Sequence, residues 1–276
     1  AAASRRCSKL SSTSSRRWSP TVAESVSFDP SARAAAVSTS AGSASEASGL
    51  GPGPVSAQTI TADPLLVEQI AERRAALLSR IAERTDRPVR VVCVTKGHPP
   101  VVAASAMAAG FTDLGENYAQ ELRSKADELS DAVTASGASW HFIGRLQTNK
   151  VRLIAPVVSL WQSVDRASLA EAVAQRAPSA SVLVQLDLAG IDGRGGCRPD
   201  DAPALVGRCN ELGLHVEGLM GVGPPGDPED ARAGFRLLSA LADDLGLAER
   251  SMGMSGDLDV ALDEGATMIR VGSSLV

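Results

Sequence analysis

The feature that most constrains the fold is a regular alternation of short apolar runs with longer amphipathic stretches from about residue 60 onward. The apolar runs predict strands, and the stretches between them show helical spacing, as in Phe235, Leu238 and Leu241. Such alternation implies parallel strands joined by right-handed crossovers. Eight strands predict a single closed (β/α)8 barrel over residues 61–276, with a doubly wound open sheet as the alternative. The expected strands are 89–95, 112–117, 140–144, 160–165, 181–188, 216–222, 250–255 and 267–272.

A helix is expected before the first strand, at residues 64–84. Asp63 can cap this helix, Pro64 suits its first turn, and apolar residues such as Ile70 fall on one face. The sequence continues for only four residues past Gly272, which leaves no room for an outer helix after the eighth strand. We therefore expect helix 64–84 to fill that place in the ring of helices.

Residues 1–60 differ in composition from the rest of the chain. They contain 16 Ser and 12 Ala, and such a segment cannot bury enough apolar surface to offset the entropy of ordering. We predict that they form a disordered tail. Their Arg- and Ser-rich start is compatible with a transit peptide. The sequence begins with Ala1 rather than Met, so non-native upstream sequence is equally compatible.

The composition of the remaining residues argues against several classes of function. Residues 61–276 carry 21 basic and 29 acidic side chains, and aromatic residues make up 3% of the chain. A domain with net negative charge and few aromatic side chains on which bases could stack is not typical of nucleic-acid binding proteins. No apolar run approaches the ~18–20 residues that cross a bilayer. We therefore expect a cytoplasmic protein that binds neither nucleic acid nor membrane.

The cysteines and histidines give no sign of a disulfide framework or a metal site. Four cysteines without a C-x-x-C pair indicate reduced thiols in an intracellular protein. The three histidines are too scattered to predict metal ligands by spacing. They are His98, His141 and His215.

The stretch VRVVCVTKGHPP ends a buried apolar strand in a lysine, Lys96. Reactive groups of a (β/α)8 barrel lie at the carboxyl ends of its strands. A lysine flanked there by apolar wall is expected to be partly desolvated, which favours a neutral amine able to form a Schiff base. The alternative is a solvated surface lysine that ends the strand.

Two further strand ends carry polar residues. The stretch GENYAQEL places Asn117 at the second strand–helix junction, where it can cap the next helix or contact a ligand. The stretch WHFIGRLQTNK places His141 in the third strand and Gln147, Asn149 and Lys150 at the start of the following helix. His141 is compatible with a satisfied core histidine or with a ligand contact.

The last two strand ends suit an anion. Ser255 precedes a helix, and Gly272 and Ser273 follow the last strand, so backbone amides can approach a phosphate at both junctions. Barrels often bind phosphate at the loops after strands seven and eight. Arg270 is unusual because it lies in an otherwise apolar strand, and a buried arginine requires a partner.

Six stretches, taken together, resemble a known family: the single-domain pyridoxal 5′-phosphate (PLP) homeostasis proteins, which are related to the barrel of bacterial alanine racemase. The resemblance covers roughly residues 62–276 and implies PLP as the cofactor. The stretches occur in family order and are VTKGHP, GENYAQEL, WHFIGRLQTNK, SVDR, SMGMSGDLDVAL and MIRVGSS.

The resemblance implies roles for the candidate residues. Lys96 matches the lysine that forms the Schiff base with PLP, and Ser255, Gly272 and Ser273 match the phosphate-binding positions. Arg270 matches the arginine that faces the pyridine nitrogen, where a fixed cation weakens the ring as an electron sink.

Other positions match less closely. Asn117 and His141 match residues around the cofactor. Thr95 stands where many relatives have Ser, and the ending RVGSSLV departs from the usual family ending. The fit around the phosphate is the part that this departure affects.

The resemblance favours a carrier of PLP over an enzyme. Two-base racemisation needs a second proton-transfer group, a tyrosine that alanine racemase supplies from an additional domain. Tyr118 is the single tyrosine of this chain, and no residues remain for such a domain. We predict a monomeric PLP homeostasis protein that delivers or sequesters PLP, with apo PLP-dependent enzymes as candidate recipients. The alternatives are a PLP-dependent enzyme with weak amino-acid racemase activity and a Schiff-base aldolase without cofactor.

Overall fold

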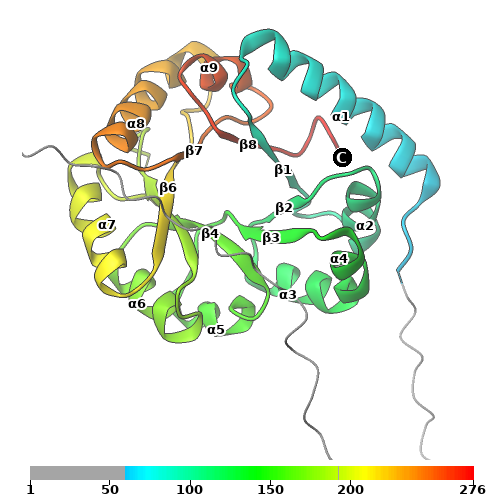
Figure 1. The fold of residues 1–276 in the computed structure, drawn as a ribbon, viewed down its shortest axis with the longest axis horizontal. Helices are drawn as coiled ribbons and strands as arrows, with labels where there is room; N and C mark the ends of the chain where they lie inside the picture. Colours follow the sequence, from blue (N-terminus) through cyan, green and yellow to red (C-terminus); the bar gives the residue numbers. More distant parts are fainter. Residues whose placement is uncertain (1–59, 192) are drawn as a thin grey trace, which may run out of the picture. The chain divides into compact units, whose positions relative to one another are not determined.

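The computed structural model describes residues 60–191 and 193–276 and shows a closed barrel of eight parallel strands, surrounded by helices (Figure 1). The predicted (β/α)8 barrel is confirmed, and an open sheet is excluded. The disorder predicted for residues 1–60 concerns residues that, apart from Ile60, lie outside the described ones. The strands are β1 (Arg90–Val94), β2 (Asp113–Glu116), β3 (Ser139–Phe142), β4 (Val158–Val164), β5 (Ser181–Leu186), β6 (His215–Gly221), β7 (Glu249–Ser251) and β8 (Met268–Val271).

Each predicted strand is present, but the seventh is shorter than the sequence predicts. The expected range was 250–255, whereas β7 ends at Ser251. Gly253 has a φ of 96°, which is unfavourable for other residues and ends the extended conformation. The backbone N–H of Met254 then donates to Asp257 Oδ1 at 2.6 Å, so the chain turns towards the next helix.

The helices cover the outside of the barrel. They are α1 (Pro64–Arg84), α2 (Pro100–Ala108), α3 (Ala119–Glu128), α4 (Ser130–Ser136), α5 (Val151–Ile154), α6 (Ala167–Arg176), α7 (Ala202–Glu211), α8 (Arg232–Asp244) and α9 (Leu258–Asp263). Short 3₁₀ turns at Thr148–Lys150, Pro199–Asp201 and Pro228–Ala231 precede α5, α7 and α8.

Helix α1 confirms the helix predicted at residues 64–84. Asp63 Oδ1 accepts hydrogen bonds from the backbone N–H groups of Leu65 at 2.9 Å and Leu66 at 3.3 Å, as expected of an N-cap. Figure 1 shows α1, in cyan, lying along the outside of the barrel between α9 and α2. It therefore fills the place that the sequence predicts for it.

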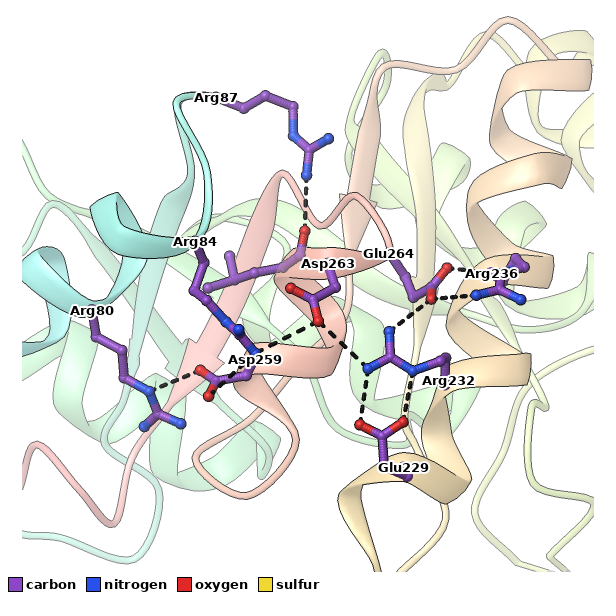
Figure 2. Close-up of polar contacts among 10 residues, drawn as sticks. Arg80, Arg84, Arg87, Glu229, Arg232, Arg236, Asp259, Asp263 and Glu264 are labelled. Carbon is purple, nitrogen blue, oxygen red and sulfur yellow. Dashed lines mark hydrogen bonds and ion pairs between the residues drawn. The ribbon is translucent and has the colours of Figure 1, made fainter.

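Helix α9 is held from both sides by arginine side chains (Figure 2). From α1, Arg80 donates to Asp259 at 2.8 Å, and Arg84 lies 3.6 Å from the same carboxylate. From α8, Arg232 lies 3.0 Å from Glu264 at the end of α9. Exposed ion pairs contribute about 0–1 kcal/mol each. Their effect here is mainly geometric, because they fix the helix that follows the β7–α9 loop.

The barrel interior contains an apolar cluster and a set of polar side chains. The apolar cluster is separate from the larger core between strands and helices, and consists of Val92, Leu160, Leu183, Met220 and Met268. The buried polar side chains that share this lumen include His141, Gln162, Ser251 and Arg270. The carboxyl ends of the strands form the open mouth at which a barrel binds ligands.

Candidate cofactor site

Lys96 lies in the turn that follows β1, at the mouth of the barrel. Val92 belongs to the lumen cluster, and Thr95 directs its hydroxyl outward to Glu116 at 2.6 Å. Continuing the alternation of strand side chains past the outward-facing Thr95 predicts that Lys96 faces the lumen. The residue is exposed, so the expected partial desolvation is wrong. The apolar wall of β1 ends at Val94, two residues before the lysine.

A buried ion cluster on the outer side of the barrel wall fixes the turn after β1. Lys125 of α3, only 2% exposed, donates to the backbone carbonyl of Thr95 at 2.6 Å and to Glu116 Oε1 at 2.7 Å. Glu121 accepts from Lys125 at 2.7 Å and from the backbone N–H of Gly97 at 2.6 Å. The residues on both sides of the candidate lysine are thus tied to one ammonium group.

Asn117 follows β2 at the mouth, and its amide oxygen is buried without a hydrogen-bond partner among the described residues. The side chain does not cap α3, whose N-cap is Tyr118. Gly144, after β3, packs on the Asn117 backbone so closely that a Cβ there would lie 2.2 Å from the Asn117 carbonyl oxygen. A buried polar atom without a partner calls for an explanation, and it favours the ligand contact over the cap.

Arg270 lies in β8 with its guanidinium inside the barrel. Its hydrogen-bond partners are neutral: Nη1 donates to Ser251 Oγ at 2.6 Å and Nη2 to the Gly221 carbonyl at 2.7 Å. The predicted need for a partner is confirmed. Burial lowers the pKa of Arg270 to about 10, against the opposing effect of the Asp257 charge. At neutral pH the group therefore stays charged, with no direct carboxylate partner among the described residues.

A chain of hydrogen bonds runs from Arg270 through the lumen. Ser251 donates to Gln162 Oε1 at 2.6 Å, and Gln162 Nε2 lies 2.9 Å from His141 Nδ1. His141 Nε2 in turn lies 3.1 Å from Asp113 Oδ1. All links are satisfied if the His141 proton is assigned to Nε2. His141 is therefore a satisfied core histidine, connected to the mouth through Arg270.

Asp113, the first residue of β2, ends this chain at the amino-terminal side of the barrel. Burial raises the pKa of its carboxyl, but hydrogen bonds from His141 and Arg90 outweigh burial and hold the pKa well below its usual range. Arg90 Nη2 donates to Oδ1 at 2.6 Å. The lumen chain thus has a cation at one end and a carboxylate at the other.

The loops after β7 and β8 meet at two serines. Ser255 Oγ lies 3.1 Å from Ser274 Oγ, and both Ser274 and the predicted Ser273 are exposed. Gly272 lies against β1, where a Cβ would be 3.0 Å from the Val94 carbonyl oxygen. Within the described part of the chain, the backbone N–H groups of Ser255, Ser273 and Ser274 donate to no protein acceptor. These hydroxyl and amide donors fit a phosphate, and the buried Arg270 cation fits a ring nitrogen.

Two residues of this arrangement, Gln162 and Ser251, were missed by the sequence reasoning, and Ser274 was noted at the last junction without a role of its own. The two lumen residues, Gln162 and Ser251, lie 89 positions apart. Ser251 is the first residue of the stretch SMGMSGDLDVAL, but nothing in that stretch indicates a contact with Gln162. The second serine of GSS was the only signal for Ser274.

The cysteines described by the structure are poor nucleophiles. Burial raises the pKa of Cys93 to about 12 and the pKa values of Cys197 and Cys209 to about 11. Residues 60–191 and 193–276 contain no group of three or more His, Cys, Asp or Glu side chains placed to bind a metal ion. In the same ranges, no helix has the length and apolar character needed to span a membrane.

Comparison with known proteins identifies relatives over most of the chain. The family model for the alanine racemase N-terminal domain matches residues 71–276. A pyridoxal phosphate homeostasis protein of Pseudomonas aeruginosa is 39% identical over 220 residues, which are 75% of this chain and 94% of the relative. The protein of that name from Deinococcus radiodurans is 40% identical over 201 residues, 70% of this chain and 91% of the relative.

Solved structures show the same fold. PipY of Synechococcus elongatus, solved with PLP bound, is 34% identical, with a TM-score of 0.66, over 75% of this chain and 99% of PipY. An alanine racemase of Clostridium difficile is 15% identical, with a TM-score of 0.60, over 75% of this chain and 59% of the racemase. At that identity the racemase supports the fold alone.

Proposed function

Because this chain belongs to the family of pyridoxal phosphate homeostasis proteins, built on the alanine racemase N-terminal domain, we propose that it binds PLP and takes part in PLP homeostasis. The observation that carries the proposal is the Arg270 guanidinium, buried below the barrel mouth with only neutral partners. Burying a cation without a carboxylate partner costs free energy. An interaction with the ring nitrogen of a ligand would explain why Arg270 is retained. The PLP bound to PipY, which aligns with 75% of this chain, supports the same ligand.

PLP supplies an aldehyde that condenses with a primary amine and a ring that withdraws electrons. In our proposal, the Lys96 amine binds the aldehyde as a Schiff base. The Ser255 and Ser273 region and the backbone at Gly272 bind the phosphate, with Ser274 as an additional donor. Asn117 contacts the cofactor at the rim. His141 does not contact the cofactor in this proposal. It helps to position Arg270 through hydrogen bonds that pass through Gln162 and Ser251.

We propose a carrier rather than an enzyme. The fixed charge of Arg270 disfavours a proton on the ring nitrogen, which weakens the ring as an electron sink. A second base for racemisation has to reach the reacting carbon. Tyr118, the single tyrosine, is 60% exposed, which argues against that role. The second candidate function is weak amino-acid racemase activity, which the match of residues 71–276 to the alanine racemase N-terminal domain favours.

We further propose that the protein acts as a cytoplasmic monomer that delivers PLP to apo-enzymes or sequesters it. The large exposed hydrophobic residues of the described chain are scattered, among them Leu65, Tyr118 and Leu237, which supports a monomer. Light scattering coupled to size exclusion tests the oligomeric state. Reactivation of an apo PLP-dependent enzyme by the loaded protein, compared with free PLP, tests delivery.

The function is tested by absorbance and turnover of the purified full chain. The PLP-loaded protein is expected to be yellow, and Lys96→Ala to lose this absorbance while remaining folded. Lys150→Ala, which removes the other partly exposed lysine described, is the control and keeps the absorbance. Turnover of D- or L-alanine well above that of free PLP would favour the racemase. Cleavage of the carbon–carbon bond of an aldol substrate without bound PLP would favour the cofactor-free aldolase.

A further inference from the structure

A cavity beside the barrel mouth is not used by the proposed cofactor site, except that Asn117 borders both. The cavity, which we call the rim pocket, has a volume of about 490 Å³. Its walls come from the residues after β2, β3 and β4, so three of the polar stretches singled out in the sequence converge on it. They supply, among others, Tyr118 and Gln120 (GENYAQEL), Arg145 and Lys150 (WHFIGRLQTNK) and Arg166 (SVDR).

The rim pocket carries uncompensated positive charge. Three cations and no carboxylate line it. Arg166 is already engaged, since Nη1 donates to Asp165 at 2.5 Å and Nη2 to the Leu146 carbonyl at 2.8 Å. Arg145 has a single long contact, 3.4 Å to the Gly193 carbonyl, and Lys150 forms no ion pair within the described residues. Arg145 and Lys150 are therefore available to an anion.

The pocket is also preorganised. Leu146 is buried and anchors the loop between the two available cations, and Lys150 ends a 3₁₀ turn closed by its own N–H donating to Gln147 O at 2.9 Å. Helix α3 starts at the pocket without a side-chain cap, and the two residues before it, Asn117 and Tyr118, line the pocket. Two free cations and uncapped N–H groups suit a dianion better than a single carboxylate.

We propose that the rim pocket binds a phosphorylated small molecule, with its phosphate on Arg145 and Lys150. The volume suits a small ligand, and the amides of Asn117, Gln120 and Gln147 suit a polar body. This site is distinct from the phosphate position at Ser255 and Ser274, on the β7 and β8 side of the mouth. It does not depend on the proposed attachment of PLP to Lys96.

The test is calorimetric titration of the full chain after PLP has been fixed by borohydride, so that the cofactor phosphate site is filled. Inorganic phosphate and pyridoxine 5′-phosphate, which lacks the aldehyde, are the two probes. We expect saturable binding of one equivalent that weakens as salt is raised. Tighter binding of pyridoxine 5′-phosphate would identify a vitamin B6 phosphate as the ligand, and equal binding would identify the phosphate group alone.

Arg145→Gln and Lys150→Gln are each expected to weaken binding about tenfold, since each removes a charged hydrogen-bond donor. Arg152→Gln is the matched control, because Arg152 lies on the same segment, is exposed and does not line the pocket. Absence of saturable binding, or equal binding in wild type and both pocket variants, would overturn the proposal. If borohydride fixes no PLP, the proposed function fails, and the same variants titrated without cofactor still test the pocket.

Discussion

Two buried cations, Lys125 and Arg270, lie on opposite sides of the barrel wall and are treated in opposite ways. Lys125, between the barrel and α3, lies 2.7 Å from both Glu116 and Glu121. Arg270, inside the barrel, donates only to a serine hydroxyl and a backbone carbonyl. The first charge is neutralised within the protein, whereas the second remains available to a ligand.

The difference separates a structural charge from a functional one. A neutralised cluster fixes the turn that carries Lys96, and removing the Lys125 ammonium leaves the buried Glu116 carboxylate without its cation. A buried charge with only neutral partners costs folding free energy, and in our proposal Arg270 is retained for the ligand that it binds. The two residues should therefore respond differently to the same substitution.

The largest effect on stability is expected for Lys125→Met. The substitution leaves Glu116 and Glu121 without their cation, so the free energy of unfolding should fall by about 3–5 kcal/mol in urea titrations. Lys150→Met is the control and should change it by less than about 0.5 kcal/mol. Adding Glu116→Gln to the Lys125 variant should restore part of the loss. A loss below about 1 kcal/mol in the single variant would contradict a structural role for the cluster.

Arg270→Met should show the reverse pattern. It removes a costly buried charge and strands two neutral acceptors, so the stability of the ligand-free protein should change by less than about 1.5 kcal/mol. Release of PLP should be at least about tenfold faster, because the ring loses its charged partner. Arg250→Met, in the neighbouring strand β7, is the control for release. Unchanged PLP release in the Arg270 variant would break the comparison.

Gln162→Leu sharpens the comparison, because it interrupts the hydrogen bonds between Arg270 and Asp113 at a residue that is not one of the proposed ligand contacts. We expect a loss of about 1–3 kcal/mol in stability from the unpaired neighbours, together with PLP release intermediate between wild type and Arg270→Met. Gln185→Leu, at a buried glutamine of β5 outside the chain, should leave release unchanged. If the Gln162 variant lost stability but released PLP at the wild-type rate, the lumen hydrogen bonds would have no part in positioning Arg270.

The smallest effect concerns acid. The pKa of the Asp113 carboxyl is lowered in the folded protein, so its contribution to stability is present above the unfolded pKa, near 4, and is lost as pH falls below it. The free energy of unfolding of wild type should therefore fall more steeply below about pH 4 than that of Asp113→Asn, by about 1–2 kcal/mol. If the two stability curves ran parallel, the Asp113 carboxylate would not contribute to stability as we propose.

Local patterns predicted much of the fold. Helix α1 has its cap and its apolar face in one stretch of sequence, and its bounds, Pro64–Arg84, agree with those expected. Arg270 stood out because a cation interrupts an apolar strand. Lys125 did not, since its stretch resembles an exposed helix surface until packing brings Glu116 of β2 against it.

The lumen chain could not be predicted for the same reason. Ser251 and Gln162 come from strands that are not neighbours, and their contact depends on the register and tilt of the closed barrel. The exposure of Lys96 also depends on where β1 ends, which periodicity locates only to within a few residues.

The central claim is that PLP is held at the barrel mouth by the Lys96 amine, and peptide mass spectrometry after borohydride reduction tests it most directly. The chain has four lysines, Lys9, Lys96, Lys125 and Lys150, so the modified position can be assigned without ambiguity. We predict that the reduced cofactor mass is found on the peptide containing Lys96 and is lost in Lys96→Ala. The mass on another lysine, or on none, in protein that was incubated with PLP would contradict the account.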